Sequence, residues 1–162
     1  MLASGALFGV AAGLILGRDW RRLAAVHLRW IPLLLIGLIA RGVAPSLPGL
    51  AFVLYLFAIT STTLVAAVNF RLVGAALIAI GGALNLAVVL LNGGMPVDPA
   101  SVTAIGAVMP TDALHVTLSE ATRLALLADV IGLPVVRSVY SVGDFCIAAG
   151  GFLVPFVLLV RR

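Results

Sequence analysis

The chain has 162 residues, of which 63% are hydrophobic and only 10% are charged. Soluble globular domains carry charge on roughly a quarter of their residues, so this composition excludes an ordinary soluble domain and predicts an integral membrane protein. A nucleic-acid-binding arm and a coiled coil are also excluded, because each needs dense charge or sustained heptads. The net charge of +4 is carried by arginines that mostly flank apolar runs, so we interpret them as markers of membrane topology.

Uncharged intervals locate the membrane-spanning segments, because about 20 apolar residues cross a bilayer as a helix. Four such intervals are free of charged residues. A further apolar segment contains His27, Arg29 and Pro32, and it can cross the membrane only if the Arg29 side chain reaches the membrane–water interface. The positive-inside rule, with the long 92–143 connection discounted, favours five crossings over four. The predicted transmembrane helices are residues 2–17, 23–40, 50–70, 72–91 and 145–160.

The prediction is therefore one all-α membrane domain, residues 1–162: a bundle of about five transmembrane helices and an outer helical segment. Its expected location is the bacterial inner membrane, with the N-terminus outside and the C-terminus in the cytoplasm. The outer segment, residues 92–143, contains Thr117 and Glu120 at the spacing of a capping box, with Gly132 after the following apolar run. This pattern predicts a helix over residues 118–131.

Four glycines repeat every fourth residue along the first predicted helix: Gly5, Gly9, Gly13 and Gly17. Small residues at this spacing let two helix backbones approach closely in lipid. We expect this stripe to pack inside the bundle. A second copy of the chain or a larger membrane complex are the alternative partners.

Two features of the outer segment are candidate binding sites. Asn92, Gly93 and Gly94 suit the end of a helix before Pro96, and their successive amides also predict a turn that binds an anion or a carbonyl oxygen. His115 is a further polar candidate in the same segment.

Asp129 and Asp144 lie on the same predicted side of the membrane and form the other candidate site. Asp144 follows Ser141 at the spacing of a second capping box, which is a structural explanation for it. Two carboxylates that come close can share a proton and activate water, so the pair is also a candidate catalytic dyad. Arg137 lies between them in sequence and is a candidate ion-pair partner for either.

Two resemblances concern these residues. The chain resembles a family of small, uncharacterised bacterial multi-pass membrane proteins, through the Asn-Gly-Gly-Met-Pro-Val run at residues 92–97, His115, Asp129 and the Ser-Val-Gly-Asp run at residues 141–144. This resemblance implies the architecture but no activity. A weaker one is to lipoprotein signal peptidase, whose second catalytic Asp opens its final helix as Asp144 does here. The Asn-Arg context of that family is missing, and five spans are predicted where it has four.

The sequence favours a non-enzymatic component that binds a membrane lipid or a quinone, or that belongs to a larger membrane complex. The alternative is an aspartyl-type intramembrane hydrolase using Asp129 and Asp144. No cofactor, metal or nucleic acid is expected: Cys146 is the only cysteine, and His27 and His115 fall on opposite sides of the predicted membrane.

Overall fold

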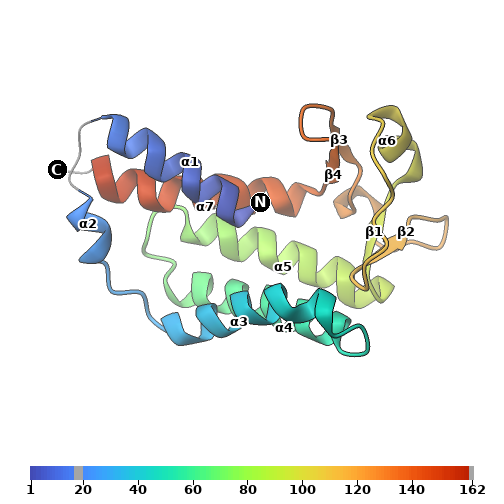
Figure 1. Ribbon diagram of the computed structural model, residues 1–162, viewed down its shortest axis with the longest axis horizontal. Coiled ribbons are helices and arrows are strands. Elements are labelled where there is room, and N and C mark those ends of the chain that lie inside the picture. Colours follow the sequence, from blue (N-terminus) through green and yellow to red (C-terminus); the bar gives the residue numbers. More distant parts are fainter. Residues whose placement is uncertain (17–19, 161–162) are drawn as a thin grey trace.

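The computed structural model describes residues 1–16 and 20–160, and it has a helical bundle at one end and an irregular, strand-containing segment at the other (Figure 1). Apolar sequence explains the bundle, because helices satisfy every backbone polar group internally. Its helices are α1 (Leu2–Ile15), the short α2 (Arg21–Ala24), α3 (Ile31–Val43), α4 (Ala51–Val68), α5 (Ala75–Asn92) and α7 (Val142–Val160).

The long helices pack in an order that differs from their order in the chain. Extensive contacts join α1 to α7, α7 to α5, α5 to α4 and α4 to α3. Helices α1 and α3 are therefore the outermost members of the series, and they lie on opposite sides of the bundle (Figure 1). Neighbours run antiparallel except α1 and α7, which are parallel, since Gly5 meets Ala148 and Gly13 meets Leu159.

The glycines of α1 form its contact with α7. Gly5, Gly9 and Gly13 are buried, and a Cβ on Gly9 would collide with the backbone carbonyl of Phe152. The described part of the stripe is thus occupied by a helix of the same chain. Gly17, its fourth member, lies outside the described residues.

Three of the described helices, α4, α5 and α7, are long and apolar enough to cross a membrane. They correspond to the predicted spans at 50–70, 72–91 and 145–160, although α7 begins earlier, at Val142. Helix α1 and the apolar helical stretch Ile31–Ser46 are shorter. These lengths and compositions are those of a membrane protein, and the count of five spans stays a prediction.

The predicted helix over residues 23–40 is wrong in its first half. Helix α3 begins only at Ile31, after Trp30, which has a left-handed backbone with φ of 62°. The side chain of Asn69, at the end of α4, accepts a hydrogen bond from the Arg29 amide and donates one to the Arg29 carbonyl, both at 2.9 Å. These bonds replace the helical partners of Arg29, so the segment is a connection at the end of the bundle.

The prediction of an all-α chain with an outer helical segment is also wrong in this segment, although most of the described chain is helical. Short strands pair there: β1 (Met95–Val97) with β2 (His115–Thr117) in parallel, and β3 (Ile131–Leu133) with β4 (Ser138–Tyr140) antiparallel. The short helix α6 (Pro99–Ala104) is capped at its N-terminus by Asp98, whose carboxylate accepts hydrogen bonds from the Ala100 and Ser101 amides.

The predicted helix over residues 118–131 contains only a short 3₁₀ turn, Ala125–Leu127. Distant groups bind its backbone instead. The Asn92 side chain binds both the amide and the carbonyl of Arg123, at 2.8 and 2.9 Å, and Leu118 donates to the Val97 carbonyl. Thr117 pairs with Val97 in the strand ladder, so it does not act as the cap of a helix. Strand pairing thus replaces the helix that the capping-box pattern predicted.

We predict that Gly9→Ala destabilises the bundle, because the added methyl has no space between α1 and α7. Overpacking of this kind costs about 1–3 kcal/mol of unfolding free energy. Gly42→Ala on α3 is the matched control, since nothing lies within 4 Å of a Cβ there and helix propensity rises. A thiol-reactive fluorogenic dye on the single Cys146 would report thermal unfolding in detergent. Equal melting temperatures for Gly9→Ala and Gly42→Ala would contradict this packing.

Candidate functional site

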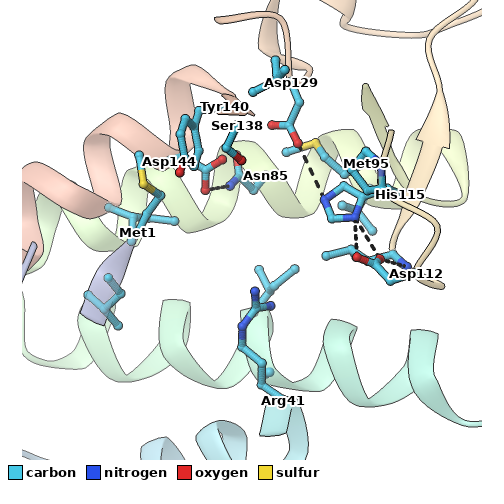
Figure 2. A pocket seen from close by; sticks show the side chains of 18 of the residues that line it. Met1, Arg41, Asn85, Met95, Asp112, His115, Asp129, Ser138, Tyr140 and Asp144 are labelled. Carbon is cyan, nitrogen blue, oxygen red and sulfur yellow. Dashed lines mark hydrogen bonds and ion pairs between the residues drawn. The ribbon is translucent and has the colours of Figure 1, made fainter. Parts of the chain in front are cut away.

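A cavity of about 680 Å³ lies where the bundle meets the outer segment. All five long helices contribute to its wall, with Ala6 from one outermost helix and Leu38 from the other. Most of the lining is apolar side chain, and the polar groups gather where the outer segment covers the helices (Figure 2). A cavity with apolar walls and a few convergent polar groups is the usual form of a small-molecule site.

Strand β1 positions two of the polar residues. Met95 pairs with His115 on one edge, and Val97 forms a bridge with Asp129 on the other. The Asp129 amide donates to the Pro96 carbonyl at 2.9 Å, and its carbonyl accepts from Asp98 at 3.0 Å. Because alternate residues of a strand share a face, Met95 and Val97 present their partners to the same side. All four residues line the cavity.

Asp112, His115 and Asp129 form a chain from the surface to the buried end of the site (Figure 2). The His115 Nδ1 lies 2.8 Å from the nearer oxygen of Asp112, and Nε2 lies 3.7 Å from Oδ2 of Asp129. The Asp112 side chain is 41% exposed and that of Asp129 only 7%. Burial acts to raise the pKa of Asp112, but hydrogen bonds from the Leu114 amide and from His115 outweigh it and lower that pKa.

Asp129 is the least satisfied polar group of the site. Its Oδ1 atom is buried and has no hydrogen-bond partner within the part of the chain that the structure describes. Burial, followed by the negative charge of Asp144, raises the pKa of Asp129 to about 8. The carboxyl is therefore mostly protonated at neutral pH, and one oxygen of this cavity-lining residue has no hydrogen-bond partner among the described residues.

Asp144 belongs to a second polar cluster at the start of α7. The Asp144 amide donates to the Ser141 hydroxyl at 3.0 Å, and the Ser141 amide donates to the Asp144 carboxylate at 3.3 Å. The predicted capping box at Ser141 and Asp144 is thus present. Asn85 of α5 donates to the other carboxylate oxygen at 3.3 Å, and its own oxygen lies 3.0 Å from the Ser141 hydroxyl. This cluster joins α7 to α5.

Arg41 of α3 faces these acidic groups from the opposite wall (Figure 2). Its guanidinium lies 5.6 Å from the centre of the Tyr55 ring, a distance that permits a cation–π interaction. Among the described residues no carboxylate lies within ion-pairing distance of Arg41. The cavity therefore has an acidic wall and a cationic wall with space between them.

The structure brings together three predicted site residues, His115, Asp129 and Asp144, at this cavity. It does not bring Asn92, Gly93 and Gly94 there. Asn92 binds the backbone of Arg123, Gly93 ends α5 with a left-handed φ of 68°, and Gly94 packs against β2. Four residues that sequence reasoning left out of the site come from other elements and have no local spacing that points to it: Arg41, Asn85, Ser138 and Tyr140. Asp112 also lines the cavity, and its local signal is the three-residue spacing to His115.

No group of three or more potential metal ligands occurs among the described residues. Arg137, the candidate ion-pair partner, lines the cavity on an exposed turn with φ of 48°. Its guanidinium makes no ion pair with Asp129 or Asp144 in the described structure.

The pKa of Asp129 predicts a pH dependence of stability. From its ordinary value of 3.8 up to about 8, the folded chain holds a proton that the unfolded chain has lost. Stability from this group is complete below about pH 4 and falls steadily up to about pH 8, because the folded state binds more protons throughout this interval. In Asp129→Asn we expect a flatter profile and a higher melting temperature at pH 8, measured on delipidated protein by tryptophan fluorescence. Exposed Glu120→Gln is the control, and a wild-type slope in Asp129→Asn would contradict the argument.

A protein-family model matches residues 20–156 of the chain, and it is described as a family of unknown function, DUF5317. The match includes α3, α4, α5, the whole outer segment and most of α7, and so includes most of the cavity wall. No curated protein and no solved structure matches the chain. The predicted membership of an uncharacterised family is confirmed: the chain belongs to the family of unknown function DUF5317.

Proposed function

We propose that this protein is a non-enzymatic membrane component that binds one amphiphilic lipid in the cavity between the bundle and the outer segment. The observation that carries the proposal is the combination of a mostly apolar cavity of about 680 Å³ with charged side chains that gather beside the outer segment (Figure 2). An amphiphile has the same division, because its head needs hydrogen bonds and its hydrocarbon tail needs apolar surroundings.

The position of the cavity in the bundle supports entry from the bilayer. Its wall includes Leu2 and Ala6 of α1 and Leu38 of α3, the outermost helices of the packing series. A tail that leaves the cavity between these two helices enters the hydrocarbon of the membrane directly. The polar groups come from Arg41 in the last turn of α3, from Asn85 in the second half of α5 and from Asp144 in the first turn of α7, a depth that suits a lipid head group.

The orientation that we propose is an N-terminus outside and a C-terminus in the cytoplasm of a bacterial cell, with five inner-membrane crossings. Arg21, Arg29 and Arg71 lie near the helix ends that are remote from the outer segment. The positive-inside rule assigns these arginines to the cytoplasm, so the outer segment and the polar end of the cavity face the exterior. The two shorter helices, α1 and α3, cross with little tilt or in a thinned bilayer.

A hydrolase remains the second candidate, because Asp129 and Asp144 line the same cavity and the charge of Asp144 raises the pKa of Asp129. Their contacts favour separate roles: Asp144 binds Ser141 and Asn85, whereas Oδ2 of Asp129 lies 3.7 Å from the ring of His115. Hydrolysis requires that Asp129→Asn and Asp144→Asn each abolish turnover of a membrane-anchored peptide. Activity that survives in both folded variants would end this reading.

The lipid proposal is tested by narrowing the cavity. Ala6→Phe places a ring in the cavity wall, whereas Ala11→Phe places the same ring on the exposed face of the same helix. We expect wild type and Ala11→Phe, extracted gently and measured by native mass spectrometry, to retain one lipid per chain. Ala6→Phe is expected to lose most of it, because ring and lipid compete for the same volume.

Thermal unfolding of both variants checks that they fold. Equal lipid retention by Ala6→Phe and Ala11→Phe, or no retained lipid in the wild type, would contradict the proposal. The same spectra report the mass of the assembly and so identify a second copy of the chain or a further subunit.

A further inference from the structure

We propose that the bound lipid has a zwitterionic head with a primary ammonium and a phosphate, as in an aminophospholipid. The ammonium would lie at the acidic wall formed by Asp129 and Asp144, and the phosphate at Arg41 on the opposite wall. This inference rests on the proposed function, since it names the class of lipid that the cavity selects.

The acidic wall contains one carboxylate oxygen, Oδ1 of Asp129, that receives no hydrogen bond in the described structure. Asp129 is only 5% exposed, its Oδ1 has no partner within the described structure, and the residue lines the cavity. Its other oxygen is already near His115. An ammonium donates up to three hydrogen bonds and accepts none, so it fits a carboxylate oxygen without a donor. The positive charge also favours the ionised carboxylate and offsets the cost of its burial.

Neighbouring groups make the acidic wall a site for a cation rather than for one neutral donor. Asp144 adds a second carboxylate to the same cavity, and the hydroxyl groups of Ser138 and Tyr140 line the cavity beside it (Figure 2). The charge of Asp144 contributes to raising the pKa of Asp129. A cation between two carboxylates relieves their repulsion, whereas a neutral group leaves it in place.

The cationic wall fits the other half of the head. The Arg41 guanidinium points into the cavity from α3, and its described interaction is with the face of Tyr55 rather than with a carboxylate. The planar guanidinium binds phosphate oxygens through two parallel hydrogen bonds. Arg41 is close to the end of α3 that meets the outer segment, where lipid phosphates lie in the proposed orientation.

Other common head groups satisfy only part of this arrangement. An anionic phosphatidylglycerol fits Arg41 but offers no cation to Asp129 and Asp144. A quinone is neutral and leaves both walls without a counter-charge. A phosphatidylcholine carries the right charges, but its quaternary ammonium has no N–H group to donate to Oδ1 of Asp129. Selection among these lipids therefore depends on the two walls together.

The test uses the full, delipidated chain in detergent and four lipids with matched tails where chemistry permits: phosphatidylethanolamine, phosphatidylcholine, phosphatidylglycerol and ubiquinone. Native mass spectrometry measures the apparent Kd of each. We expect phosphatidylethanolamine to bind about tenfold or more tightly than each of the other three, since loss of one charge-assisted contact has this effect on affinity.

Two variants separate the walls, and the ratio of affinities within one sample is unaffected by a loss of folded protein. Asp129→Asn is expected to bring the ratio for phosphatidylethanolamine over phosphatidylglycerol down about tenfold, because it removes the ammonium acceptor. Arg41→Gln is expected to weaken both phospholipids. The control variants Glu120→Gln and Arg123→Gln change exposed side chains that do not line the cavity, and they should keep the wild-type ratio.

Preferential binding of phosphatidylglycerol or ubiquinone would overturn this inference while leaving the lipid-binding function in place, provided that Ala6→Phe excludes that lipid. An unchanged lipid ratio in Asp129→Asn would also overturn it. If none of the four lipids binds and native extraction retains no lipid either, the proposed function itself fails.

Discussion

The site depends on the hydrogen bonding of one very short strand. Pro96 and Val97 of β1 are bound on both edges, by β2 on one side and by the backbone of Asp129 on the other. Each edge delivers one polar side chain, so His115 and Asp129 meet across a strand of three residues. The strand follows α5 directly, after the left-handed turn at Gly93, and the buried Met95 packs into the same core cluster as Val88 and Val89. Helix α5 thus fixes the position of β1, and β1 fixes the positions of His115 and Asp129.

The same arrangement explains why the Asp129 carboxyl stays buried although its burial costs free energy. A carboxyl that is buried beside another carboxylate is costly, and folded proteins keep such groups where they serve binding or chemistry. Here the backbone of Asp129 is held by two hydrogen bonds, to Pro96 of β1 and to Asp98 directly after it, so its side chain has little freedom to withdraw to solvent. The apolar helices around it lower the local dielectric and strengthen any interaction with a bound charge. Burial of Asp129 therefore lowers the stability of the fold and at the same time strengthens the binding of a charged ligand.

Local patterns predicted the features that have local causes. Apolar runs located α4, α5 and α7, and the Ser141–Asp144 spacing predicted the cap that begins α7. The helix predicted over residues 118–131 failed because Asn92, far away in the chain, binds the backbone of Arg123. Asp129, Asp144 and His115 were identified as chemically unusual, but their meeting with Arg41 is a tertiary event. No spacing in a single sequence reports which helices become neighbours, and the order α1, α7, α5, α4, α3 could not be inferred from the arginine pattern.

The pairing of α1 with α7 has a consequence for biogenesis. A ribosome makes α1 before every other helix of the bundle, and it makes α7 after them. The close contacts of Gly5, Gly9 and Gly13 are all with α7, so the first helix has no proper neighbour while the middle of the protein is being inserted. Since domains begin to fold during synthesis from the N-terminal side, this helix must wait in lipid or be held by the insertion machinery. The wall that α1 supplies to the cavity is consequently completed last, after the polar end has already formed.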